Sequence, residues 1–185
     1  FGEIKSIQEK MNNPFWGYEG PYILSELGST GYWDPYLKQK WGMTLEENDQ
    51  EKALCLKKLF NEYEKDNHIL GSYVFYWGNK QEYSPTWFNL FGENGEKTAM
   101  LDEINYQWSG TRFKNSPPKI KLFEFQNNIN LKEKLKPNTQ YKINYEIESM
   151  DSISTYLEVL RKSNRIKNIY DNEIKPISLN FKYKI

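Results

Sequence analysis

The feature that most constrains the fold is a change in hydrophobic periodicity at Asn115–Pro118. Before this point, apolar residues recur at three- and four-residue intervals or in short continuous runs, which are the patterns of amphipathic helices and buried strands. After it, apolar residues alternate at a period of two, which is typical of strands with one exposed face. The sequence therefore predicts two domains, residues 1–116 and residues 117–185.

The first domain alternates between helices and strands. Residues 4–11, 46–65 and 97–108 have helical spacing, while the apolar runs 21–28 and 69–78 are predicted to be strands covered on both faces. This alternation is typical of a parallel α/β domain. Because two parallel strands cannot close a barrel or bury both faces of a sheet, a free-standing α/β domain is the weaker interpretation.

The second domain contains strand-like runs separated by Asn and Lys-Pro turns. The runs cover residues 120–125, 141–147, 156–160 and 177–185. They predict an antiparallel, all-β sandwich of the immunoglobulin-like type. Such a sandwich needs about seven strands, so we expect this chain to contain only part of one.

Glu26 is the first candidate for a catalytic residue. It lies at the C-terminal end of the run 21–28, and parallel β/α folds build their active sites at that end of their strands. An exposed glutamate at a strand end explains the same position equally well. Glu46 and Glu47 are interpreted differently, as acidic residues at the start of a helix that complement its dipole.

Aromatic residues are concentrated in the connections that follow the two strands. Trp33, Trp41 and Trp87 lie there, and each of them either contacts a ligand or packs its loop against the domain. Lys80 and Glu82 follow the second strand. They either contact substrate or form an ion pair that pins the loop.

The composition argues against several classes of function. Positive and negative residues number 25 each, so no net field favours nucleic acid or an anionic membrane. No apolar run reaches the roughly 20 residues of a membrane span. The single histidine, His68, and single cysteine, Cys55, leave no zinc site. Aromatic residues make up 16% of the chain, which favours a ligand with apolar faces, such as a sugar.

Neither a signal peptide nor an initiator methionine precedes Phe1, so we expect the sequence to begin within a longer protein. A periplasmic or secreted location is the expectation, although no signal within the sequence specifies it.

Five motifs in the first two thirds of the chain belong together: Pro21–Gly28, Trp41–Gly42, Glu51–Ala53, Gly71–Glu82 and Pro85–Trp87. They resemble the closing part of a clan A glycoside hydrolase barrel, closest to bacterial proteins grouped with the family 2 TIM-barrel domain. The resemblance covers roughly these two thirds, and the region from Pro117 resembles the immunoglobulin-like module often attached to such barrels.

The resemblance implies a role for particular residues. Glu26 would be the nucleophile at the end of the seventh barrel strand, and Trp77 would form the floor of a sugar subsite at the end of the eighth. Phe1–Gly2 would end the sixth strand. Trp33, Lys80 and Glu82 remain candidates for contact with the substrate of such an enzyme. The acid/base glutamate of the fourth strand has no counterpart in this sequence, so we expect the chain alone to be inactive.

The implied activity is that of a retaining glycoside hydrolase acting on O-glycosidic bonds of a glucan-like oligo- or polysaccharide, with no cofactor. Such an enzyme needs two carboxyl groups about 5 Å apart, one to attack the anomeric carbon and one to protonate the leaving oxygen. A transglycosylase would use the same intermediate. The alternative from a different class is a non-catalytic carbohydrate-binding or scaffolding protein on the same barrel.

Overall fold

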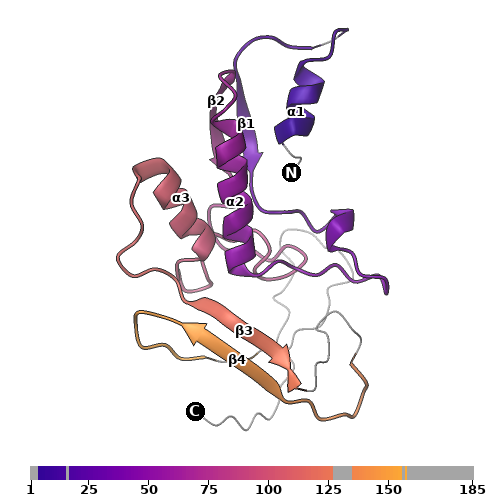
Figure 1. The fold of residues 1–185 in the computed structure, drawn as a ribbon, viewed down its shortest axis with the longest axis vertical. Coiled ribbons are helices and arrows are strands. Elements are labelled where there is room, and N and C mark those ends of the chain that lie inside the picture. Colours follow the sequence, from indigo (N-terminus) through magenta and orange to yellow (C-terminus); the bar gives the residue numbers. More distant parts are fainter. Residues whose placement is uncertain (1–3, 16, 127–134, 156, 158–185) are drawn as a thin grey trace.

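A computed structural model of the chain describes residues 4–15, 17–126, 135–155 and 157. The helices and strands predicted within these residues are confirmed, with small shifts at their ends (Figure 1). The strands predicted from residue 156 onward lie outside the described residues, apart from Leu157, and so does Phe1–Gly2. In chain order the elements are α1 (Ile4–Met11), β1 (Tyr22–Leu27), a 3-10 turn (Pro35–Leu37), α2 (Asp49–Tyr63), β2 (Ile69–Val74), α3 (Ala99–Ser109), β3 (Lys119–Phe125) and β4 (Ile143–Glu148).

β1 and β2 form a parallel pair, as the alternation of helices and strands predicts. Tyr22 pairs with Ile69 at one end, and Leu27 pairs with Val74 at the other. Helix α2 connects the two strands and packs against α3 (Figure 1). Because both strands run in the same direction, their C-terminal ends and the loops that follow them lie at one edge of the pair.

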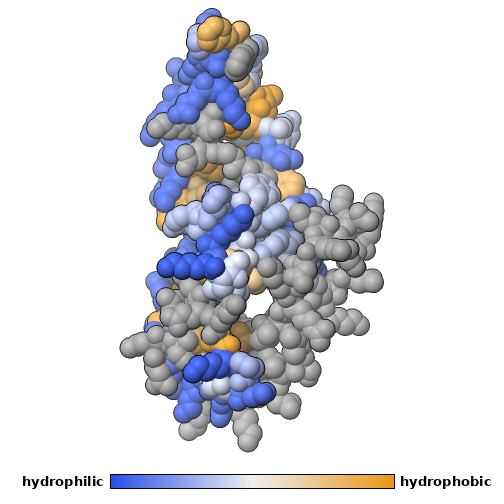
Figure 2. Space-filling model, turned by 90° about the vertical axis from the view of Figure 1, so that its right-hand side faces the viewer, coloured by the Kyte–Doolittle hydropathy of each residue, from blue (hydrophilic) through white to orange (hydrophobic). Residues whose placement is uncertain are grey.

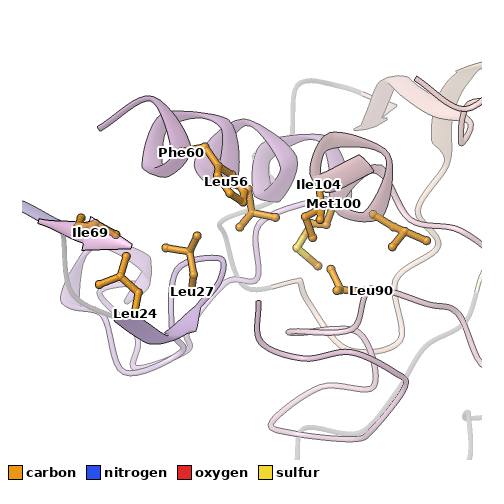
Figure 3. Close-up of a cluster of buried hydrophobic side chains, with 9 residues drawn as sticks. Leu24, Leu27, Leu56, Phe60, Ile69, Leu90, Met100 and Ile104 are labelled. Carbon is orange, nitrogen blue, oxygen red and sulfur yellow. The ribbon is translucent and has the colours of Figure 1, made fainter. Parts of the chain in front are cut away.

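A single apolar cluster holds this α/β region together. Leu56 and Phe60 project from one side of α2 toward the strand residues (Figure 3). The two residues are one helical turn apart, so they lie on the same face of the helix. The buried members of the cluster are Leu24, Leu27, Leu56, Phe60, Ile69, Leu90, Met100, Leu101 and Ile104.

The prediction that both strands are covered on both faces is wrong for the described residues. Leu24 and Leu27 are buried, but Ile23 is 55% exposed, and Leu70 and Tyr73 of β2 are also exposed. The reason is that the described sheet has two strands, and α2 and α3 supply a core on one side of it. The strand pair is therefore only partly buried.

Helix α2 begins later than its charge pattern predicts. Its N-cap is Asn48, whose side chain accepts a hydrogen bond from the Glu51 amide, while the Glu51 carboxylate accepts one from the Asn48 amide. This reciprocal arrangement is a capping box, and it satisfies two amide donors that the helix leaves free. The prediction that Glu46 and Glu47 occupy the start of this helix is therefore wrong.

The segment between α3 and β3 is held against the first region by polar contacts. The Arg112 guanidinium pairs with Asp102 at 2.9 Å and with Glu103 at 2.5 Å. The side chain of Gln50 on α2 donates to the carbonyl of Pro118 at 3.0 Å. Beyond this segment, β3 and β4 pair antiparallel, as their period-two pattern predicts. The complete immunoglobulin-like sandwich stays a prediction.

None of the helices in the described part of the chain combines the length and the apolar character that a membrane-spanning helix requires.

Candidate functional site

Glu26 lies next to the last residue of β1, at the edge where both parallel strands end. The Phe75 amide donates to the Leu27 carbonyl at 2.8 Å, so the chain leaving β2 runs directly beside the end of β1. Glu26 is exposed between two buried leucines. Among the described residues, its carboxylate has neither a hydrogen-bond donor nor a cation as a partner. It is therefore available to an incoming group.

Trp77 lies in the segment that continues from β2 across this edge. The segment bonds to a later part of the chain, because Tyr76 donates to the Phe88 carbonyl at 3.0 Å and Phe91 donates to the Gly78 carbonyl at 3.4 Å. The indole of Trp77 packs edge-to-face on Phe91 and is 59% exposed. An exposed indole on a hydrogen-bonded backbone is a surface on which a sugar ring can stack.

Trp33 occupies the loop after β1, residues 29–48, which extends to one side of the strand pair (Figure 1). The loop is anchored by buried Leu37, whose carbonyl accepts from the Leu45 amide at 2.9 Å. Figure 2 views the molecule from that side, and the coloured middle of this face combines pale residues of intermediate hydropathy with strongly hydrophilic ones.

An aromatic cluster joins this loop to the one that follows β2, residues 75–91. Tyr32 stacks on Tyr83 with ring centroids 5.1 Å apart, and the buried indole of Trp87 donates to the Thr30 carbonyl at 3.0 Å. Tyr83 holds a left-handed backbone with φ of 66°, which is uncommon for a bulky residue. The cluster comprises Tyr32, Trp33, Phe75, Tyr76, Tyr83, Trp87 and Phe88.

Lys80 and Glu82 form an ion pair at the border of this cluster. The Lys80 ammonium lies 4.4 Å from the ring centroid of Phe75 and 4.9 Å from that of Tyr76. Burial, followed by the negative charge of Glu82, raises the pKa of Tyr32 above its usual value. The structure therefore contains the loop-pinning ion pair that was the alternative to substrate contact, and it leaves both groups partly exposed.

The structure brings Trp33, Lys80 and Glu82 to one aromatic cluster. Trp87 is a buried member of this cluster. Trp77 lies on Phe91, and Glu26 lies at the end of β1. Of the three loop tryptophans, Trp33 and Trp41 are exposed, whereas Trp87 is buried and belongs to the core.

Sequence reasoning missed a partly buried polar network centred on Glu46. The Glu46 carboxylate pairs with the Lys52 ammonium and accepts hydrogen bonds from the hydroxyls of Ser84 and Thr86. Lys52 is only 4% exposed and also donates to the Thr86 carbonyl at 2.9 Å. The network ties α2 to both loops at the edge that carries the candidate residues.

One signal in the sequence could have indicated this network. Lys52 precedes Leu56 by four residues and Phe60 by eight, which places it on the apolar face of α2. A lysine on such a face requires a buried partner because an unpaired buried charge is strongly unfavourable. The identity of that partner, however, depends on segments that only the fold brings together.

The site contains acidic and aromatic groups rather than a metal cluster. In the part of the chain that the structure describes, no group of three or more His, Cys, Asp or Glu side chains could hold a metal ion. No protein-family model matches the chain, and no curated protein is significantly similar to it.

Proposed function

We propose that this chain carries the nucleophile and the sugar-binding surface of a retaining glycoside hydrolase that acts on glucan-like oligo- or polysaccharides. Glu26 is the nucleophile, and Trp77 is the stacking platform for the sugar that is attacked. The acid/base carboxyl comes from residues outside this chain, in the closed barrel that the sequence resembles.

The position of Glu26 carries this proposal. It is an exposed carboxylate without a partner among the described residues, at the C-terminal end of a strand in a parallel pair. Near this edge, Glu46 and Glu82 are both paired with lysines, and Glu47 has an oxygen that is buried without a hydrogen-bond partner. A nucleophile needs an oxygen that the substrate can reach, so the exposed carboxylate of Glu26 is the better candidate.

The reaction proceeds in two displacements. In the first, a Glu26 oxygen forms a bond to the anomeric carbon, the bond from that carbon to the leaving oxygen breaks, and the second carboxyl group protonates the leaving oxygen. In the second, the same carboxyl group deprotonates a water molecule, which attacks the anomeric carbon and releases Glu26. If a sugar hydroxyl replaces the water, the product is a transferred glycan. Neither step requires a cofactor.

The surrounding residues support recognition of a sugar. Trp77 presents an exposed indole to an apolar sugar face, and Lys80 and Glu82 present polar groups at the rim of an aromatic cluster. Carbohydrates combine these two kinds of surface, with C–H groups on the ring faces and hydroxyl groups at the edges. Recognition through aromatic rings flanked by charged side chains therefore matches this class of ligand.

The test is covalent labelling of the full-length protein with a panel of 2-deoxy-2-fluoro glycosyl fluorides, followed by peptide mass spectrometry. We expect one sugar of the panel to label Glu26, and we expect Glu26→Gln to abolish the label. Glu9→Gln, a change of an exposed glutamate on α1, is the matched control and should be labelled normally.

Two other outcomes have defined meanings. Labelling of Glu82 that disappears in Glu82→Gln would contradict Glu26 as the nucleophile while retaining the glycosidase. If no sugar labels the protein but glycan binding persists in Glu26→Gln, the alternative of a non-catalytic carbohydrate-binding or scaffolding protein is supported instead.

A further inference from the structure

The indole of Trp33 lies directly against the backbone of Gly31. A Cβ atom added at Gly31 would come within 2.8 Å of the indole Cδ2 and closer still to Cε2 and Cζ2, well inside van der Waals contact. Gly31 itself is buried. The absence of a side chain at this position therefore creates the space that the indole occupies.

Other contacts restrict the same indole. The ring of Tyr32 meets it edge-to-face with centroids 4.8 Å apart, and the buried ring of Phe88 is tilted against it at 6.0 Å. The Asp34 amide donates to the Gly31 carbonyl at 2.9 Å, which closes a turn around Trp33. Even so, Trp33 is 46% exposed. One part of the ring is packed in a fixed position, and the rest faces solvent.

Polar groups lie beside this ring. Tyr32 connects Trp33 to Tyr83, the residue that follows Glu82 in the chain, and the charge of Glu82 acts on the Tyr32 hydroxyl. Phe88 connects Trp33 to Phe75, over which Lys80 lies. An exposed and oriented aromatic ring next to an ion pair of partly exposed groups is the arrangement that favours an oriented sugar.

We propose that Gly31 is a positioning residue that seats Trp33 as a second sugar-stacking platform, with Lys80 and Glu82 as the adjacent polar groups. This inference rests on the proposed function. It extends the site from the sugar at Trp77 to a further sugar of the same glucan-like chain, bound at Trp33. The substrate is accordingly an oligosaccharide or polysaccharide that occupies both loops, rather than a single sugar.

Gly31→Ala tests this seat without removing the indole. The backbone of Gly31 is outside the left-handed region, and the three atoms nearest to an added Cβ all belong to the Trp33 indole. Gly71→Ala is the matched control because Gly71 also has an ordinary backbone, and an added Cβ there would meet nothing within 4 Å. The two variants introduce the same methyl group in different surroundings.

The experiment has two readouts on the full-length protein. Fluorine NMR of 5-fluorotryptophan reports the environment of each indole, with Trp33 assigned from Trp33→Phe. Calorimetry measures binding of cellohexaose and laminarihexaose. We expect Gly31→Ala to shift the Trp33 resonance and weaken binding by about threefold to tenfold, the loss of roughly one aromatic contact. Gly71→Ala should change neither readout.

A double-mutant cycle separates positioning from a general structural effect. If Gly31 acts through Trp33, Gly31→Ala should weaken binding in the wild-type background but not in a Trp33→Ala background. Equal weakening of binding in both backgrounds would contradict the proposal that Gly31 positions Trp33. An unshifted Trp33 resonance in Gly31→Ala would contradict it as well.

The outcomes also distinguish this inference from the function on which it rests. If neither oligosaccharide binds the wild-type full-length protein while a fluorosugar labels it at Glu26, the second platform is wrong and the glycosidase stands. If binding depends on Gly31 and Trp33 but no fluorosugar labels Glu26, the platform stands and the catalytic proposal fails.

Discussion

The two ends of the β1–β2 pair differ in how their carboxylates are satisfied. At the N-terminal end, Asp66 accepts hydrogen bonds from the side chains of Gln8 and Tyr22 and from the His68 amide, each at 2.9 Å. At the C-terminal end, Glu26 has no partner among the described residues. Asp66 thus connects α1, β1 and the turn before β2, whereas Glu26 connects no elements among the described residues.

This difference separates acids that stabilise the fold from the carboxylate that we propose as the nucleophile. Acids that stabilise a fold are satisfied by donors, as Asp66 is, or by a buried cation, as Glu46 is by Lys52. An exposed acid that lacks such partners contributes little to stability, so the proposed role of Glu26 as a nucleophile predicts that its replacement changes activity rather than stability. The comparison can be tested by changing each group in turn.

The largest effect is expected at Lys52, which anchors the loops of the C-terminal edge. Lys52→Met should lower the free energy of unfolding by about 3 kcal/mol, because it leaves the Glu46 carboxylate without its buried cation. Urea denaturation measures this loss. Lys121→Met, which breaks the exposed pair with Glu148 on the β3–β4 sheet, is the control and should change stability little. Equal losses would show that burial does not decide the effect.

Asp66 should give the next largest effect. Asp66→Asn replaces an anionic acceptor of several hydrogen bonds with a neutral amide, so we expect a loss of about 2 kcal/mol in unfolding free energy. Oligosaccharide binding at the opposite end should be unchanged, which calorimetry can check. Weakened sugar binding in this variant would show that the two ends of the strand pair do not act independently.

The pH dependence of the Tyr22–Asp66 hydrogen bond sharpens the comparison. Hydrogen bonds, most strongly that from Gln8, lower the pKa of Asp66 to about 2, while burial and then the bond to Asp66 raise the pKa of Tyr22 to about 12. The depressed Asp66 pKa gives stability that is present above about pH 4 and lost as the pH falls toward 2. The raised Tyr22 pKa gives stability that is present below about pH 10 and lost as the pH rises toward 12.

Wild type should therefore exceed Tyr22→Phe in stability by about 1 kcal/mol on a plateau between about pH 4 and pH 10. The difference should shrink on both sides of this plateau, as measured by denaturation at several pH values. A difference that stays constant across the whole range would mean that the Tyr22 hydroxyl contributes nothing through this bond.

The smallest effect is expected at Glu26 itself. Glu26→Gln should change the unfolding free energy by less than about 0.5 kcal/mol, since the exposed carboxylate has no partner to lose among the described residues. The same variant should abolish fluorosugar labelling of the full-length protein. A loss of stability as large as that of Asp66→Asn would instead identify Glu26 as a structural acid.

Much of the fold could be predicted because its signals are local. The spacing of Leu56 and Phe60 predicts an amphipathic α2, and the alternation around Phe123 predicts a strand. The coverage of β1 was mispredicted, because an apolar run such as Tyr22–Leu27 has the same appearance whether one or two of its faces are packed. The start of α2 was misplaced because Asn48 outcompetes nearby acids as an N-cap.

The candidate site was predicted only in part. The positions of Glu26 and Trp77 after consecutive strands indicated one edge of a parallel pair, and the structure places both strand ends there. The packing of Trp33 against Gly31 was not predicted, because nothing in the sequence distinguishes Gly31 from another loop glycine. Glu46 was assigned to a helix dipole, whereas it binds a buried lysine.

By itself, the sequence determined the kind and order of the helices and strands that the structure describes, and their period-two or helical patterns. Those properties follow from neighbouring residues along the chain. Only the tertiary structure decided which carboxylates have hydrogen-bond or ion-pair partners and which indoles are packed in a fixed orientation. Asp66 reaches Gln8, and Glu46 reaches Ser84, across long stretches of sequence, and such contacts exist only once α2 and the two strands have packed together.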